Sequence, residues 1–145
     1  MLLKSIAGLH VPDKGEVWFD EVLFNKLDFN SQKEIRKEMG MLFQGSALFD
    51  SLTVEQNVRF PLDMFTNKSM EEKTERVNFC LNRVNIFNAN KLYPSELSGG
   101  MKKRVAIARA ISLNPKYLFC DEPNSGLDPV NAILIDELIK ELTEE

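Results

Sequence analysis

Apolar residues recur at helical spacing in the second half of the chain. After Ser69, apolar residues at helical spacing predict a helix, with an apolar stripe interrupted only at Lys73. A second apolar run follows Gly100, and a third follows Pro129, a residue typical of the first turn of a helix. The three stripes are Met70, Val77, Cys80, Leu81 and Val84; Val105, Ala106, Ile107, Ala108, Ala110 and Ile111; and Val130, Ile133, Leu134, Leu138 and Leu142.

Short continuous apolar runs predict buried strands at 39–43 and 117–120. Gln44 follows the first run, and Asp121 follows the second. Turn residues divide the segment 15–24 into two short strands, which predict an antiparallel hairpin. Strands that alternate with helices indicate an α/β fold. Helices are also predicted at 1–9 and 31–37, and capping boxes at Thr53 with Gln56 and Ser69 with Glu72 predict two helices between 53 and 94.

The composition is that of an ordinary globular protein of 145 residues, 43% hydrophobic and 28% charged. The 18 basic and 22 acidic residues give a net charge of -4, which argues against a nucleic-acid partner. No apolar run approaches the length of about 18 residues that a membrane span needs, and the first nine residues lack the core of a signal peptide. Cys80 and Cys120 are expected to be reduced core residues.

Two adjacent carboxylates, Asp121 and Glu122, end the second predicted strand. Side chains alternate along a strand, so the two acids are expected to point to opposite sides, one toward a magnesium ion and the other toward a reacting water. The alternative is a solvated strand end before Pro123.

Ser98, Gly99 and Gly100 precede the central apolar run. Serine is a good N-cap, and the first N–H groups of a helix have no acceptor within the helix. The helix dipole adds partial positive charge there, and glycine lets a phosphate approach the backbone closely. Two glycines in a first turn cost roughly 1 kcal/mol each relative to alanine, so an anion site is favoured over a plain serine cap.

The segment 97–104 resembles the signature motif of ATP-binding cassette (ABC) ATPases, and 118–128 resembles their Walker B strand and D-loop. The resemblance implies an incomplete P-loop NTPase core of the ABC ATPase type, with ATP and Mg²⁺ as cofactors. It implies that Ser98, Gly99 and Gly100 bind the γ-phosphate of an ATP held mainly by a second subunit, most simply in a homodimer. Asp121 would bind magnesium, and Glu122 would be the general base toward the attacking water.

The same resemblance implies roles for two further residues, Gln44 and Asp128. Gln44 would be the Q-loop glutamine, which contacts magnesium and water and couples the site to a membrane permease. The simpler interpretation of Gln44 is a turn residue after a strand. Asp128 precedes Pro129 and is expected to be an N-cap, and in the family the D-loop also crosses to the second subunit.

The phosphate loop of such enzymes, G-x-x-x-x-G-K-S/T, does not occur in the chain. Gly40 and Gly45 have the right spacing, but Ser46 and Ala47 follow them where lysine and a hydroxyl residue are required. No histidine follows Glu122 to serve as the family's switch histidine. The sequence is therefore interpreted as the middle of a longer domain, or as a product with a wrongly assigned start, and is expected to be inactive alone.

The expected organisation is a partial ATPase core at 1–52 and 101–145, with a helical subdomain at 53–100 that ends in the signature motif. In the family such a subdomain grips the permease, so the protein is expected to be cytoplasmic and peripheral on the inner membrane. Candidate permease contacts are Phe60, Pro61, Leu62, Met64 and Phe65, with internal packing as the alternative.

Within the family, the segment 43–49 and Met101 are similar to the Mla/Mce group of lipid-trafficking ATPases, which implies lipid or another hydrophobic cargo. ABC-type DNA-repair ATPases share these motifs but place a long coiled coil between glutamine and signature. Ser98 follows Gln44 by only 54 positions, which favours the transporter type. A non-catalytic partner that lends its signature motif to another subunit remains an alternative.

Overall fold

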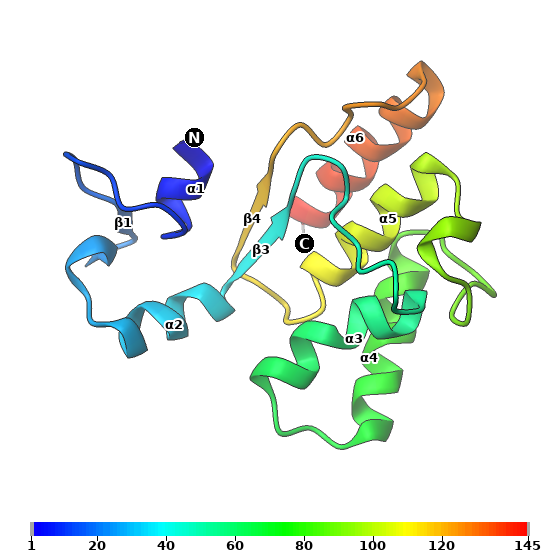
Figure 1. The fold of residues 1–145 in the computed structure, drawn as a ribbon, viewed down its shortest axis with the longest axis horizontal. Helices are drawn as coiled ribbons and strands as arrows, with labels where there is room; N and C mark the ends of the chain where they lie inside the picture. Colours follow the sequence, from blue (N-terminus) through cyan, green and yellow to red (C-terminus); the bar gives the residue numbers. More distant parts are fainter. Residues whose placement is uncertain (1, 145) are drawn as a thin grey trace.

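The computed structural model describes residues 2–144, in which a two-stranded parallel sheet joins a small N-terminal part to a larger layer of helices (Figure 1). The helices are α1 (Leu2–Ile6), α2 (Phe29–Lys37), α3 (Val54–Phe65), α4 (Met70–Arg83), α5 (Gly99–Ala110) and α6 (Pro129–Thr143), with 3-10 turns at Phe24–Lys26 and Pro94–Glu96. The strands are β1 (Trp18–Phe19), β2 (Val22–Leu23), β3 (Met39–Leu42) and β4 (Tyr117–Cys120). Within residues 2–144 no helix has the length and apolar character needed to cross a membrane.

The two longer strands pair in parallel, with Met39 opposite Tyr117 and Leu42 opposite Cys120. The backbone N–H of Asp121 donates to the carbonyl of Leu42 at 2.9 Å, which extends the ladder by one residue. The carboxyl ends of β3 and β4 therefore lie side by side, and the polar residues that follow the two strands share one edge of the sheet.

The predicted strand at 117–120 forms, but the prediction that it is buried was wrong, because all four residues of β4 are only half-buried. Within the described residues, β4 has a single neighbouring strand, and one strand cannot cover both of its sides. Cys120 is accordingly half-buried, whereas Cys80 is buried, and both thiols are free as expected. Burial raises the pKa of the Cys80 thiol.

Helices α3 and α4 start at the predicted capping boxes and pack on α5. Leu62, Val77, Leu81 and Ile107 belong to the resulting core. The predicted stripe of α4 is correct from Val77 onward but wrong at its start, because Met70 is 58% exposed at the first helical position. Two helices of 12 and 14 residues thus lie between the Gln44 strand and the signature segment, where the DNA-repair class would have a long coiled coil.

Helix α6 buries less than its sequence predicts. Leu138 is buried as expected, but Val130, Ile133 and Leu134 are 67%, 58% and 48% exposed. Ile135, which the predicted stripe omitted, is buried instead. Since α5 is the main helix that packs on α6 within the described residues, only a narrow stripe of α6 is covered.

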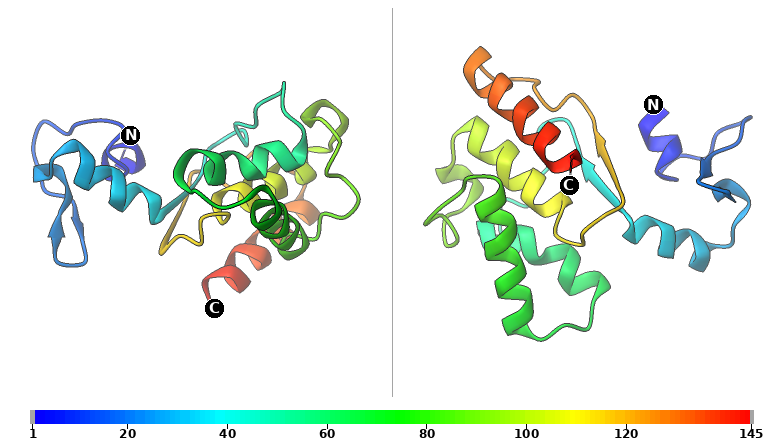
Figure 2. Two further views of the ribbon diagram at one scale, coloured as in Figure 1. Left: turned by 90° about the horizontal axis from the view of Figure 1, so that it is seen from below. Right: turned by 180° about the vertical axis from the view of Figure 1, so that it is seen from behind.

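The predicted hairpin forms, with β1 and β2 shorter than expected. Together with α1 and α2 it lies on the opposite side of β3 and β4 from helices α3 to α6 (Figure 2). Phe19 packs edge-on against Tyr117 and Phe119 of β4, with ring centroids 5.3 and 6.3 Å apart. Asp20 in the hairpin turn bonds both Lys116 and the Tyr117 hydroxyl, which fixes the hairpin to β4.

Candidate functional site

Gln44 and Glu122 meet at the carboxyl edge of the sheet. The Gln44 Nε2 donates to Glu122 Oε2 at 2.8 Å, although the two residues lie 78 positions apart. A tight turn over 43–46 presents the glutamine, with the Ser46 N–H donating to the Phe43 carbonyl at 3.2 Å. Gly45 has a φ of 79°, a left-handed conformation that glycine adopts at little cost. The sequence-predicted site residues Gln44 and Glu122 are thus brought into direct contact.

The strand alternation predicted for Asp121 and Glu122 does not apply, because the backbone leaves the strand conformation at Glu122. β4 ends at Cys120, and Glu122 has a φ of 48°, outside the range of a strand. Asp121 stays in the ladder, whereas the backbone turns at Glu122 and exposes its carboxylate. A left-handed conformation at a non-glycine residue is uncommon and clusters at functional sites.

The donors at this edge suit magnesium better than a transition metal. Among residues 2–144 no group of three or more His, Cys, Asp or Glu residues lies close enough together to hold a metal. Mg²⁺ commonly uses one or two carboxylates, with waters and substrate phosphates as its other ligands. The carboxylate of Asp121 and the amide oxygen of Gln44 are hard oxygen donors of that kind, so these residues fit the ion.

Ser98 caps α5 as predicted, since its Oγ accepts from the Met101 N–H at 3.2 Å. Ser98 and Gly99 are exposed, and a methyl group placed on Gly99 would meet only Leu127, at 3.8 Å. The amides of the first turn precede the first intrahelical bond, from the Lys102 N–H to the Ser98 carbonyl. This open helix start fits a phosphate group.

Gly100 has a packing role that the sequence did not reveal. A Cβ on Gly100 would lie 2.5 Å from the side-chain oxygen of Asn131 in α6. The Nδ2 of Asn131 donates to Asp128 Oδ2 at 2.6 Å, and Asp128 Oδ1 accepts the backbone N–H groups of Val130 and Asn131. These bonds, that of the Asn131 side chain foremost, lower the pKa of Asp128. Asp128 is therefore the expected N-cap, and Asn131 links it to the signature segment.

Replacing Gly100 with alanine should raise the pKa of Asp128, because Asn131 must turn away and give up its bond to the carboxylate. The ionised Asp128 carboxylate would then stabilise the folded state over a narrower pH range. On acidification this stabilisation would be lost at a higher pH than in the wild type. The free energy of unfolding should change by less than about 1 kcal/mol, since alanine also improves helix propensity. NMR titration of the Asp128 carboxyl measures the shift. Gly99→Ala is the control, and an unchanged Asp128 titration in Gly100→Ala would contradict the contact.

Three residues near the site were missed from the sequence: Asn131, Lys103 and Arg109. Lys103 is only 3% exposed, and its Nζ lies 3.4 Å from the Glu122 carbonyl. Arg109 donates from Nη1 to the Ala47 carbonyl at 2.9 Å and from Nη2 to the Ser46 carbonyl at 3.1 Å. The adjacent cations Lys102 and Lys103 suggest a solvated helix face. Only helical spacing indicated that Lys103 is buried, because it puts position 103 on the same face as 106 and 107.

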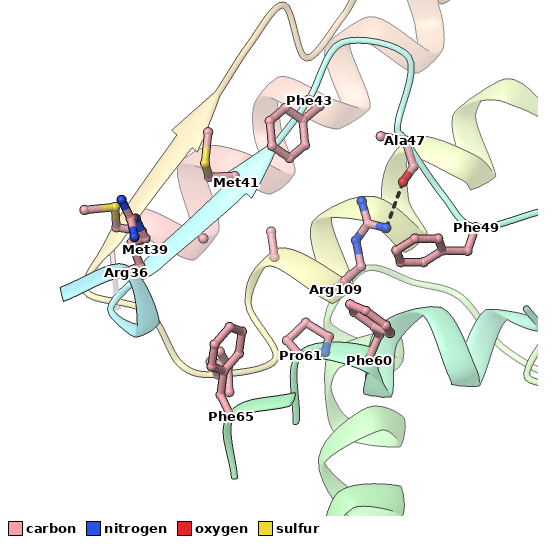
Figure 3. A pocket seen from close by; sticks show the side chains of 13 residues that line it. Arg36, Met39, Met41, Phe43, Ala47, Phe49, Phe60, Pro61, Phe65 and Arg109 are labelled. Carbon is pink, nitrogen blue, oxygen red and sulfur yellow. Dashed lines mark hydrogen bonds between the residues drawn. The ribbon is translucent and has the colours of Figure 1, made fainter. Parts of the chain in front are cut away.

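A pocket of about 330 Å³ separates α3 from the loop that follows Gln44 (Figure 3). Phe43, Ala47 and Phe49 line it from the loop, and Arg109 lines it from α5. Of the candidate permease contacts, Phe60, Pro61 and Phe65 line the pocket, and Met64 is 59% exposed elsewhere on α3. Leu62 is buried in the core, so the internal-packing interpretation is correct for that residue.

Comparison with known sequences shows that this chain is similar to ATP-binding transport proteins. Residues 1–125 match the family described as "ABC transporter". The chain is 44% identical over 144 residues to a methionine import ATP-binding protein, MetN, of Carboxydothermus hydrogenoformans, covering 99% of this chain and 42% of that protein. It is 43% identical over 143 residues to the intermembrane phospholipid transport ATP-binding protein MlaF of Haemophilus influenzae, covering 99% of this chain and 54% of that protein. The chain thus spans about half the length of these curated relatives.

Solved structures agree with the sequence comparison. The dimeric structure of MJ0796, described as a bacterial ABC transporter cassette, superposes with a TM-score of 0.86 at 35% identity, over 99% of this chain and 63% of that one. A post-hydrolysis dimer of the same cassette, bound to ADP and Pi, superposes with a TM-score of 0.85. The fold is therefore that of an ABC ATPase cassette, with its small antiparallel hairpin.

Proposed function

Because the chain belongs to the ABC transporter family, we propose that it is part of an ATP-hydrolysing subunit that drives a membrane transporter. The observation that supports this most directly is the bond between Gln44 and Glu122 at the carboxyl edge of two parallel strands. In open α/β sheets that edge is where ligands bind. We further propose that two such subunits share each ATP, held mainly by one and contacted by Ser98, Gly99 and Gly100 of the other.

The exposed Glu122 carboxylate would take the proton of the attacking water as general base. The Gln44 amide holds Oε2, which leaves Oε1 without a side-chain partner among residues 2–144. Asp121 and the Gln44 oxygen would hold Mg²⁺, whose chemistry is to neutralise charge on the phosphate oxygens. Gly99 and Gly100 would present backbone N–H groups to the γ-phosphate from the opposite subunit, and Asp128 would lie at the same subunit boundary.

We propose that the permease docks in the pocket between α3 and the 43–49 loop, and that residues 53–100 act as the helical subdomain. The pocket supports this because its walls come from both α3 and the loop of Gln44. As cargo we propose lipid or another hydrophobic compound, which the similarity to MlaF and the 43–49 segment support. The subunit would then be cytoplasmic and peripheral on the inner membrane.

Mixed dimers of the whole protein test whether the site is shared. Gly99→Asp places a carboxylate where the phosphate binds, and the open surroundings of Gly99 and the helix dipole should tolerate it. Glu122→Gln removes the base. If one subunit has Gly99→Asp and the other has Glu122→Gln, one intact shared site remains and ATP turnover persists. If both changes lie in the same subunit, both shared sites are damaged and turnover is lost.

The reverse pattern, with turnover only when both changes share a subunit, would mean that each subunit is self-contained. A whole wild-type protein without ATP turnover would contradict the proposal and support the non-catalytic partner. With the permease present in membranes, phospholipid should stimulate turnover more than methionine does. Stimulation by methionine instead would place the cargo with the MetN relatives.

A further inference from the structure

We propose that Arg109 is a positioning residue that holds the Gln44 turn in its working conformation from inside the pocket. Arg109 lies in the last turn of α5, the helix that begins at the signature segment. Its guanidinium points to the 43–49 loop and lies next to Ala47 and Phe49 (Figure 3). The proposal rests on the proposed function only in taking Glu122 as the base and the pocket as the docking surface.

The loop needs an external contact to keep its shape. Ser46 and Ala47 have φ values of 69° and 46°, a left-handed conformation that is unfavourable for residues with a Cβ. Arg109 donates to the carbonyls of both residues, at 3.1 and 2.9 Å. Hydrogen bonds from a charged donor are stronger than those between neutral groups. The two bonds therefore stabilise a backbone conformation that the loop sequence alone disfavours.

Arg109 also forms part of the surface that a docked partner would contact. Its guanidinium carbon lies 5.8 Å from the centroid of the Phe49 ring. Phe49 in turn packs on Phe60 of α3, with the two ring centroids 4.7 Å apart. Burial lowers the pKa of Arg109. A group that fills the pocket would contact Phe49 and Phe60 beside the guanidinium.

The path from Arg109 to the candidate base is short. Ser46, whose carbonyl Arg109 holds, closes the turn over 43–46 through its N–H bond to Phe43. Gln44 within that turn donates to Glu122. Loss of the Arg109 bonds should therefore loosen the turn first and the bond between Gln44 and Glu122 next.

Arg109→Met in the whole protein tests the proposal, with Arg76→Met as a matched control. Arg76 likewise donates to two carbonyls, of Ser112 and Ile111 at 2.9 and 2.8 Å, and its guanidinium carbon lies 5.0 Å from the centroid of the Phe79 ring, but neither acceptor belongs to the Gln44 loop. Hydrogen exchange of the Ser46 amide and the side-chain amide resonance of Gln44 are the readouts. In Arg109→Met we expect exchange at Ser46 to rise about tenfold or more and the Gln44 resonance to move toward that of a solvated amide.

Arg109→Lys should rescue partly, because one ammonium cannot match the two-pronged guanidinium. If Arg109→Met fails to fold, the same two readouts are measured in Arg109→Lys. Arg76→Met should leave both readouts unchanged. Ser46 exchange within twofold of wild type in Arg109→Met, or equal changes in Arg76→Met, would overturn the proposal. Neither readout needs ATP turnover, so a loosened turn in a protein without hydrolysis would contradict the proposed function and support the role of Arg109.

Discussion

Replacing Gly40 with alanine should destabilise the whole protein by about 3 kcal/mol. A Cβ at this position in β3 would lie 2.5 Å from the backbone carbonyl oxygen of Ala110 and 3.0 Å from side-chain atoms of Leu118 and Pro115. A backbone carbonyl at the end of α5 cannot rotate away, so the helix must move off the sheet. The free energy of unfolding from denaturant titration measures the effect.

Gly45→Ala is the natural comparison, because nothing lies within 4 Å of a Cβ there. Its φ of 79° makes that substitution costly through backbone strain alone, by about 1 kcal/mol. A loss in Gly40→Ala no larger than that in Gly45→Ala would mean that α5 can shift on the sheet without penalty. Such a result would contradict the close contact between Gly40 and Ala110.

Glu122→Gln should lower the single-turnover rate of ATP hydrolysis in the whole protein by roughly 10² to 10⁴, the usual contribution of a general base. Nucleotide binding should persist. The fold should also persist, because a glutamine oxygen still accepts the Gln44 amide that now bonds Oε2 at 2.8 Å. Quenched-flow hydrolysis and equilibrium nucleotide binding separate the two effects.

Asp121→Asn provides the adjacent control. It changes the neighbouring carboxylate, which is proposed to hold magnesium, and should weaken nucleotide binding chiefly when magnesium is present. If Glu122→Gln weakened magnesium-dependent binding while Asp121→Asn spared it, the two roles would have to be exchanged. Full hydrolysis by Glu122→Gln would remove Glu122 as the base.

Local signals in the sequence were sufficient for much of the fold. The capping residues Thr53, Ser69, Ser98 and Asp128 each start a helix as predicted, because a cap depends on only three or four neighbouring residues. The paired strands also form where apolar runs predicted them, one residue shorter at Phe43. The family resemblance assigned Gln44 and Glu122 to one site, but the direct bond between them was not predicted.

The errors concern what lies next to each element. The sequence of α6 is amphipathic, but periodicity does not say which face finds a partner, and Ile133 and Leu134 remain exposed while Ile135 is buried. Arg109 was missed for a related reason. Its acceptors lie 62 and 63 positions away, and no local pattern identifies a carbonyl in a distant loop as a partner.

Helix α5 connects both ends of the proposed chemistry. Its 12 residues span about 18 Å, with Ser98 at its start, Lys103 against Glu122 in its middle and Arg109 against the Gln44 loop near its end. The end of this helix packs closely on β3 at Gly40. Thermodynamic linkage makes any coupling between the two ends reciprocal. If a partner in the pocket raises the affinity for ATP, then ATP must raise the affinity for that partner by the same factor.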